Sequence, residues 1–223
     1  MLELIETKDK SHTLYNSALD ETYHSRHGAI TESKYVFIEK GLQYRLEMKE
    51  GNRCNILEVG FGTGLNAFLT LLNIRDKDQL VHYHTLEPYP LGKEIYQQLN
   101  YPEFLGEKNL FIALHEGEFE CENLIDEKFF LSKTGETIHS VDLFSDYYHL
   151  IYYDAFAPSK QADVWDLSHF EKIFRAMAPR GVLVTYCAKG QLKRDLKQVG
   201  FEVETLPGPP GKKEMVRAVK SNT

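Results

Sequence analysis

Three closely spaced glycines are the first residues in this sequence whose spacing suggests chemistry. Residues 56–66 read ILEVGFGTGLN, an apolar strand followed by a turn with Gly60, Gly62 and Gly64 and the start of a helix. Glycine permits a tight reversal and a close approach of backbone to a ligand. The spacing is GxGxG, whereas a turn that grips a pyrophosphate has GxGxxG. It favours a nucleoside ligand without pyrophosphate, such as S-adenosylmethionine, although a purely structural turn could hold the same glycines. The expected contacts are Glu58, Gly60, Phe61, Gly62, Thr63, Gly64 and Asn66.

Two acidic residues extend this cofactor hypothesis. Glu87 directly follows an apolar strand over residues 83–86, where a carboxylate can accept hydrogen bonds from both ribose hydroxyls. Glu118 follows Gly117 after an expected third strand over residues 110–114, and we expect it near the adenine amino group. An ordinary surface carboxylate is the alternative at both positions.

A third motif, DAFAP over residues 154–158, follows an apolar strand over residues 149–153. Ligands of open α/β sheets collect at the carboxyl ends of the strands. Asp154 could hold an incoming amine there by accepting its hydrogen, which favours attack through orientation. The alternative is that Asp154 serves only as a helix cap or a turn residue. The composition favours an exposed Phe156 and a Trp165 that closes the core.

Strand-length apolar runs alternate with longer helical segments, which is the pattern of a parallel sheet wrapped by helices. The expected strands cover residues 56–59, 83–86, 110–114, 149–153 and 182–186. Apolar residues three and four apart predict helices over residues 65–74, 91–99, 167–177 and 191–199.

The chain is expected to end in an antiparallel hairpin. Two strand-like runs, residues 201–206 and 215–219, are joined by PGPPG, which leaves no room for a crossover helix. We therefore predict a Rossmann-like α/β methyltransferase fold with a mostly parallel seven-stranded sheet and this terminal hairpin. Residues 1–50, helical over 31–42, would form a cover segment over the carboxyl edge of the sheet, and residues 51–223 the methyltransferase domain. An inserted hairpin is expected over residues 129–143.

Composition limits the remaining classes. The chain has 223 residues with 42% hydrophobic and 26% charged, in the range of one globular domain. No apolar run reaches the roughly 18 residues of a membrane helix, and the first ten residues lack a secretory signal. Three distant cysteines offer neither a disulfide framework nor a metal site. The sequence therefore predicts a cytoplasmic protein with no membrane association and no bound metal.

The net charge of −7 hides an asymmetry. Residues 172–223 carry eleven Lys and Arg against four acidic residues, a net +7, which leaves −14 for the rest. A basic quarter on an acidic body is consistent with a surface for a polyanion. Solvated lysines on an amphipathic helix would give the same count.

These motifs together resemble the methyltransferase domain of MnmC-type tRNA modification enzymes. The resemblance rests on GFGTGLN at residues 60–66, on Glu87 with Pro90, on DAFAPSK at residues 154–160 with Trp165, and on KKEM at residues 212–215. An upstream stretch over residues 23–37 also resembles the cover segment of this family. Two positions depart from the family pattern: Glu118 stands where an Asp is usual, and Ala162 where a Pro is usual.

The resemblance implies transfer of a methyl group from S-adenosylmethionine to the exocyclic amine of 5-aminomethyl-2-thiouridine at the tRNA wobble position. It implies the anticodon loop of tRNA as partner, and upstream enzymes that supply the aminomethyl uridine. Asp154 would orient the amine and Phe156 would stack on the base. The expected substrate-binding residues are Phe156, Pro158, Lys160, Trp165, Lys189, Lys193, Arg194, Lys212 and Lys213, the basic ones on phosphates.

Two other readings stay open. A methyltransferase acting on a small-molecule or protein amine would suit the acidic total charge. A non-catalytic nucleoside-binding partner of a modification complex would keep the glycine turn, but it would have no need of Asp154. A dehydrogenase is disfavoured by the glycine spacing and the terminal hairpin.

Overall fold

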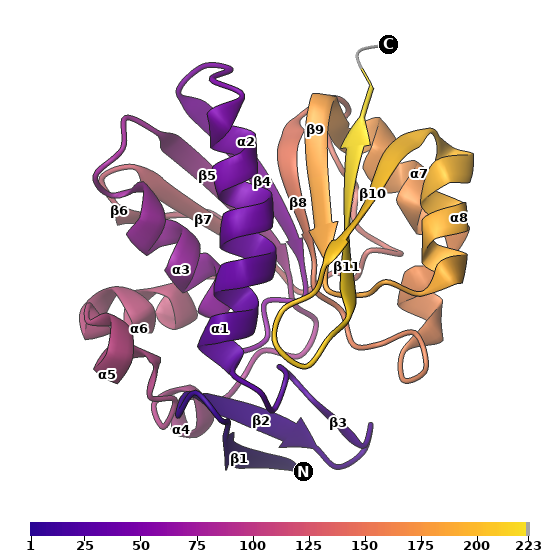
Figure 1. The fold of residues 1–223 in the computed structure, drawn as a ribbon. Coiled ribbons are helices and arrows are strands. Elements are labelled where there is room, and N and C mark those ends of the chain that lie inside the picture. Colours follow the sequence, from indigo (N-terminus) through magenta and orange to yellow (C-terminus); the bar gives the residue numbers. More distant parts are fainter. Residues whose placement is uncertain (222–223) are drawn as a thin grey trace.

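A twisted eight-stranded sheet forms the centre of the protein, which a computed structural model describes over residues 1–221 (Figure 1). The strand order is β10-β11-β9-β8-β4-β5-β7-β6. The strands are β4 (Arg53–Val59), β5 (Leu80–Leu86), β6 (Glu122–Asp126), β7 (Phe129–Thr134), β8 (Tyr148–Tyr153), β9 (Met177–Thr185), β10 (Phe201–Pro207) and β11 (Glu214–Lys220). The mostly parallel sheet with a terminal antiparallel hairpin is confirmed, with eight strands in place of the seven expected.

The inner strands are parallel and buried on both faces. Alternate residues of each strand join two separate apolar clusters, because successive side chains of a strand point to opposite sides. Ile56 belongs to the cluster beneath α3 (Leu65–Ile74), and Leu57 to the cluster beneath α7 (Leu167–Ala176). The near-continuous apolar runs seen in the sequence are the consequence.

The register of three strands determines where the site forms. β4 lies between β5 and β8, with Val59 opposite both Leu86 and Tyr153. All three strands run in the same direction, so their last residues meet at one edge. Gly60, Glu87 and Asp154 each follow one of those last residues and are therefore neighbours in space.

Helices cover both faces as expected, with changes at their ends. α3 and α8 (Gly190–Val199) lie where the periodicity predicts, and α7 ends one residue early. The helix expected over residues 91–99 is reduced to α4 (Lys93–Tyr96), because Gly92 is extended and the helix can begin only after it. α5 (Tyr101–Leu105) then starts as a separate helix with Pro102 in its first turn.

The strand expected over residues 110–114 is wrong. That segment is part of α6 (Lys108–Glu116), in which Phe111 and Leu114 are buried three residues apart. A short apolar run fits either a buried strand or one face of a helix, and here the helical packing prevails. The third parallel strand next to β5 is β7.

The inserted hairpin is also displaced. β6 pairs antiparallel with β7 around a turn at residues 127–128, whereas a hairpin over residues 129–143 was expected. Lys133 and Thr134, expected in the turn, are the last residues of the parallel strand β7. The polar residues that resembled a turn instead mark the carboxyl end of a strand.

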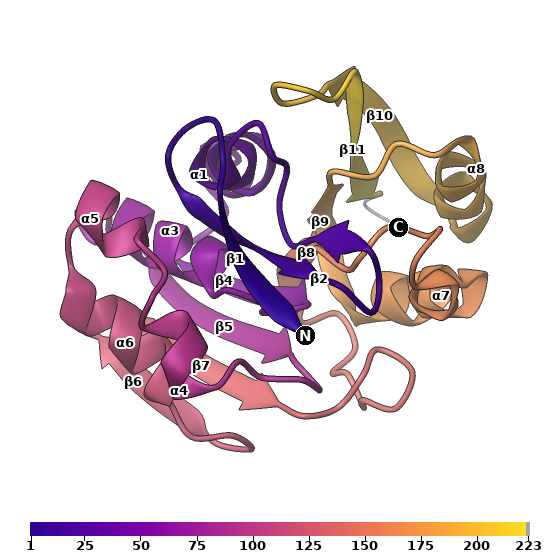
Figure 2. The same cartoon turned by 90° about the horizontal axis from the view of Figure 1, so that it is seen from below.

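The amino-terminal 50 residues form an extended part and a helical part. β1 (Leu2–Glu6), β2 (His12–Asn16) and β3 (Glu21–Thr22) make a small antiparallel sheet that lies below the carboxyl edge of the large one (Figures 1 and 2). A continuous helical segment follows, formed by α1 (Ala29–Ser33), the π-helical η1 (Lys34–Gln43) and α2 (Tyr44–Glu47). The expected helix over residues 31–42 is confirmed. Among residues 1–221, no helix has the length and apolarity needed to cross a bilayer.

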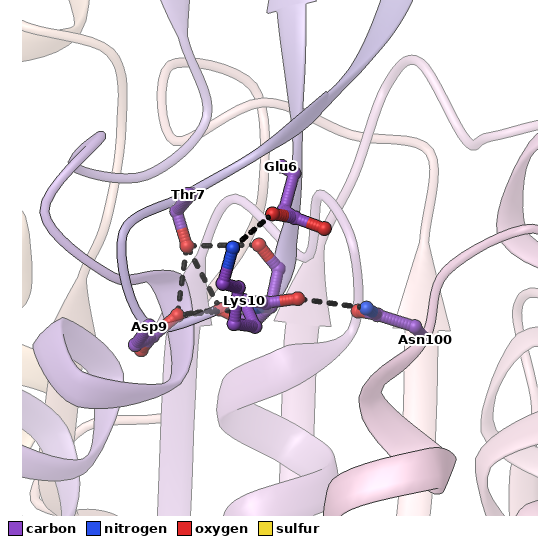
Figure 3. Close-up of polar contacts among 6 residues, drawn as sticks. Glu6, Thr7, Asp9, Lys10 and Asn100 are labelled. Atoms are coloured by element: carbon purple, nitrogen blue, oxygen red, sulfur yellow. Dashed lines mark hydrogen bonds and ion pairs between the residues drawn. The ribbon is translucent and has the colours of Figure 1, made fainter.

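Asp9 ties the small sheet to α1, and Figure 3 shows its contact with Thr7 in the connection between β1 and β2. One carboxylate oxygen accepts hydrogen bonds from the Thr7 hydroxyl at 2.7 Å and from the Ser11 amide at 3.0 Å. The other accepts from the amide and hydroxyl of Thr31, at 2.9 and 2.7 Å. Asn100 adds a second link, since it accepts from the His12 amide and donates to the Lys10 carbonyl.

These bonds fix the ionisation of Asp9. Burial alone would raise its pKa, but the hydrogen bonds from Ser11, Thr31 and Thr7 together outweigh burial and lower the pKa from 3.8 to about 2. The charged form is therefore the one that the fold stabilises.

We predict that Asp9→Asn lowers the free energy of unfolding by roughly 1–2 kcal/mol at pH 7, after allowance for solvent screening. Because the folded pKa is depressed, the stabilisation is complete above about pH 4 and is lost as the pH falls towards about 2. Urea titrations of both proteins should therefore converge over that window. The exposed Glu3→Gln is the control, and a gap that persists at pH 2 would contradict the assignment.

Candidate functional site

A cavity of about 950 Å³ opens at the carboxyl edge of the sheet, between the strand ends and the small amino-terminal sheet. This size is in the range of cofactor and small-ligand pockets. Nine of the residues singled out from the sequence line it: Gly60, Phe61, Gly62, Thr63, Asn66, Glu87, Asp154, Phe156 and Lys212. Residues from distant parts of the chain thus share one pocket.

The glycine turn has the backbone geometry that its spacing predicts. Gly60 has φ +92°, and a side chain there would place its Cβ 2.9 Å from the Asp154 carbonyl oxygen. Gly62 has φ +52°, and its Cβ would lie 3.1 Å from the ring of Tyr23. Gly64 is left-handed and directly precedes α3. The turn therefore needs glycine both for its conformation and for close contact with the neighbouring strand end.

Glu87 is held against that turn. Its Oε2 accepts the Gly62 amide at 2.7 Å and its Oε1 accepts the Tyr89 amide at 2.9 Å. Burial raises the pKa of Glu87, and the backbone hydrogen bonds oppose this. Each carboxylate oxygen has a second lone pair, so the side chain can still accept ribose hydroxyls from the cavity.

Asn66 bridges two carboxyl groups from its place in the first turn of α3. Its amide nitrogen lies 3.1 Å from Glu58 Oε1 and 2.8 Å from Asp154 Oδ2. Glu58 is fully buried, accepts the Thr85 hydroxyl at 3.0 Å, and is absent from the cavity lining. The structure therefore places Glu58 behind Asn66, whereas the sequence suggested a direct contact with the cofactor.

Burial controls the ionisation of both carboxyl groups. Burial raises the pKa of Asp154 to about 7, while the hydrogen bond from Asn66 lowers it. The pKa of Glu58 lies well above its ordinary value, first because of burial and then because of the Asp154 charge. Of these two carboxyl groups, Asp154 is the one that faces the cavity.

Aromatic rings surround the side of the cavity next to Asp154. Phe156 packs edge-on against Tyr23, with ring centroids 5.0 Å apart. Tyr186 donates from its hydroxyl to the Ala155 carbonyl at 2.8 Å and also lines the cavity. Sequence reasoning gave no role to Tyr23 or Tyr186. Tyr186 directly follows β9, so the strand-end rule applied to Asp154 would have found it, whereas Tyr23 comes from the cover segment.

Trp165 occupies a core position, as we predict from the sequence. It is buried, and its indole nitrogen donates to the Phe156 carbonyl at 2.8 Å. Trp165 and Pro158 are both absent from the cavity lining. Trp165 therefore fixes the loop that carries Phe156 from the core side, outside the cavity.

The basic residues fall into two groups. Lys160, Lys193 and Lys212 pair with Asp20, Glu214 and Glu32 at 3.3, 2.7 and 2.7 Å. Lys189, Arg194 and Lys213 are exposed, and Arg194 bonds Gln191 on its own helix. The structure does not gather all six on one open surface, because Lys212 is directed towards the cavity.

Glu118 is not brought to the cavity. It is exposed on the segment after α6, where its amide donates to Asn123, and it is absent from the lining. The reason is the wrong strand assignment, since the residue after a helix need not reach the sheet edge. The acidic residue that follows the third parallel strand is Glu136, directly after Gly135 and before the lining residues Thr137, Ile138 and His139.

A parallel sheet with this glycine turn, an acidic residue after the second strand and an antiparallel terminal hairpin defines a Rossmann-like nucleoside-binding protein of the methyltransferase class. Residues 103–221 match the family model described as S-adenosyl-L-methionine-dependent methyltransferase. The chain belongs to this family, and S-adenosylmethionine is its cofactor.

Named relatives agree with this assignment. The bifunctional protein MnmC for tRNA 5-methylaminomethyl-2-thiouridine biosynthesis from Burkholderia multivorans is 28% identical over 221 residues, which cover 92% of this chain and 33% of the relative. MnmC from Pseudomonas syringae pv. tomato is 28% identical, with 88% and 32% covered. The chain thus spans about a third of the length of these curated relatives.

Two solved structures are also similar. MnmC2 from Aquifex aeolicus superposes with a TM-score of 0.80 at 28% identity, covering 98% of this chain and 70% of that one. Spermidine synthase from Thermotoga maritima has a TM-score of 0.62 at 12% identity, covering 100% and 70%, and shows the fold alone.

We predict that Glu87→Ala weakens binding of S-adenosylmethionine roughly 10- to 100-fold, because hydrogen bonds to a charged acceptor contribute about 1.5–3 kcal/mol. Isothermal titration calorimetry measures the change. Glu118→Ala is the matched control, since it removes a carboxylate that lies outside the cavity lining. Equal losses for the two variants would contradict this reading of the site.

Proposed function

We propose that this protein transfers a methyl group from S-adenosylmethionine to the exocyclic amine of 5-aminomethyl-2-thiouridine at the wobble position of tRNA. The observation that carries the proposal is the cavity that Asp154, the glycine turn and the aromatic rings of Tyr23 and Phe156 line together. The names and similarity of the MnmC relatives support the choice of substrate.

The cofactor side of the cavity fits S-adenosylmethionine. The glycine turn and Glu87 suit a nucleoside, and Asn66 Oδ1 is a buried acceptor without a hydrogen-bond partner next to Asp154. We assign the adenine side to the segment after β7, whose residues Thr137, Ile138 and His139 line the cavity, in place of Glu118. When bound, the cofactor supplies an electrophilic methyl group on a sulfonium.

The protein's own contribution is orientation. An alkyl ammonium has a pKa near that of lysine, about 10.4, so the amine must lose a proton to water before it can attack. Ionised Asp154 then accepts a hydrogen of the neutral amine, and Asn66 holds the carboxylate in place. Placement of the amine in line with the methyl group lowers the barrier through orientation.

The substrate base is proposed to rest on Phe156. A wobble nucleotide lies in a single-stranded loop, where an unstacked base can be held on an aromatic face. Trp165 and Tyr23 keep the Phe156 segment in place from two sides. An enzyme that exposes the aminomethyl group must act earlier, because this step consumes a free amine. With tRNA as substrate, we place the protein in the cytoplasm.

The direct test is incubation of the protein with labelled S-adenosylmethionine and tRNA that lacks the final methyl group, followed by nucleoside analysis. Label in 5-methylaminomethyl-2-thiouridine supports the proposal. Absence of tRNA labelling together with methylation of a small-molecule or protein amine would overturn it. Cofactor binding without any turnover would instead indicate a non-catalytic partner.

We predict that Asp154→Asn lowers kcat on the order of 100-fold, because the amine loses its charged orienting acceptor. Since the pKa of Asp154 is about 7 and the ionised form is required, wild-type kcat should rise as the pH increases through 7. The variant should lack that rise of kcat with pH, and it should still bind the cofactor in calorimetry. An unchanged pH profile in the variant would remove Asp154 from the mechanism.

We also predict that Lys189→Ala with Lys213→Ala weakens tRNA binding and flattens its salt dependence by somewhat less than one unit of slope per lost phosphate contact. Filter binding between about 50 and 200 mM salt measures the slope. Lys108→Ala, at the start of α6, is the control for loss of a distant exposed lysine. Identical slopes in all the proteins would exclude this surface as the phosphate contact.

A further inference from the structure

Lys212 has an environment unlike that of a phosphate-binding lysine. Its ammonium lies 2.7 Å from Glu32 Oε1 and 3.6 Å from the centroid of the Tyr186 ring. It lines the same cavity as Asp154, and the Lys212 side chain is 30% exposed. The neighbouring Lys213 is exposed and does not line the cavity. Two adjacent lysines therefore face different surroundings.

Glu32 holds Lys212 in this position. Glu32 as a whole residue is 5% exposed, and its second carboxylate oxygen accepts a hydrogen bond from the Ser25 amide at 2.6 Å. Glu32 comes from α1, whereas Lys212 comes from the loop between β10 and β11. The ion pair joins the amino-terminal cover segment to the terminal hairpin, and both of its residues line the cavity. A surface lysine meant for phosphate would not require this buried partner.

The pair acts electrostatically on Asp154. Burial is the main cause that raises the pKa of Asp154 and the Asn66 hydrogen bond opposes it, but Glu32 raises it further and Lys212 lowers it. The two members of the ion pair thus influence the same carboxyl group in opposite directions. Their effects can be separated by changing one member at a time.

Other ionisable groups face the cavity from every surrounding element. Burial lowers the pKa of His24 to about 4 and raises that of Tyr23 to about 12, so both are uncharged near neutral pH. Within the described residues, Lys212 is the one Lys or Arg side chain in the lining. Besides Glu32 and Asp154, the remaining ionisable groups of the lining are Glu21, Glu87, Tyr89, His139, Asp163, Asp166, His169 and Tyr186, with Cys187 beside Lys212 and Glu58 behind Asn66.

We propose that Lys212 is a positioning residue of the acceptor site, a fixed cation, held by Glu32 over Tyr186, that selects the neutral form of the incoming amine. This inference rests on the proposed function and deepens it. A cation in the same cavity disfavours an ammonium because like charges repel, and it therefore promotes loss of the ammonium proton to water. The same charge favours the ionised Asp154 that orients the amine.

The test compares three variants by the pH dependence of kcat on undermodified tRNA. Lys212→Met removes the cation and leaves Glu32 unpaired, so the midpoint of the profile should move up by roughly one pH unit. Glu32→Gln should move the midpoint down, because Lys212 then acts without its counter-charge, while the glutamine oxygen can still accept the Ser25 amide. Lys213→Met should raise KM for tRNA without moving the midpoint.

A second measurement needs no substrate. The ¹³C carboxyl signal of Asp154, assigned by its loss in Asp154→Asn, can be titrated by NMR in the wild type, Lys212→Met and Glu32→Gln. Its midpoint should rise in the first variant and fall in the second. Lys212→Arg keeps the charge and should restore the wild-type midpoint, which separates electrostatics from loss of packing or folding.

Opposite shifts for Lys212→Met and Glu32→Gln support the inference. Unmoved midpoints, or shifts in the same direction, overturn it and leave the pair with a structural role only. Failure of the proposed function is distinguishable, because the wild type would then put no label into tRNA while the NMR titration would still report on Lys212. A midpoint shift in Lys213→Met equal to that of Lys212→Met would also contradict the proposal.

Discussion

The parallel pairing of β4 with β5 on one side and β8 on the other is the constraint on which the rest of the structure depends. It aligns Val59, Leu86 and Tyr153, so the residues that follow each strand must meet at one edge. The contact is so close that only glycine fits at position 60, against the Asp154 carbonyl oxygen. The cofactor side and the acceptor side are therefore joined by backbone packing as well as by the Asn66 side chain.

Around that edge the protein buries several ionisable groups, Glu58 completely and Asp154 in part. One amide, that of Asn66, serves both Glu58 and Asp154, and burial raises the pKa of each carboxyl group. A carboxylate in such a place is held in one orientation, because it has few alternative partners. The same burial makes the charge of Asp154 sensitive to its neighbours, since screening by water is weak there. Orientation and pH sensitivity thus have a common cause.

The amino-terminal segment completes the site instead of merely covering it. Tyr23 packs against Phe156, and Glu32 binds Lys212, so two residues of the cover segment determine the shape and charge of the acceptor side. Asp9 and Asn100 hold the small sheet against α1 and the α4–α5 connection. The basic carboxyl-terminal quarter is correspondingly divided, with Lys212 inside the cavity and Lys213 on the surface.

The sequence by itself determined the glycine turn, the strands before Gly60, Glu87 and Asp154, the terminal hairpin and the helices α3 and α8, because each has a local period or spacing that tertiary packing did not change. Only the tertiary structure decided that residues 110–114 are helical, that β7 is the third parallel strand, and that Glu136 rather than Glu118 follows it. It also decided that Tyr23, Glu32 and Lys212 line the same cavity as Asp154. A short apolar run satisfies a helix and a strand equally well, and a contact between residues 32 and 212 has no local signature, so both follow from which surfaces pack together.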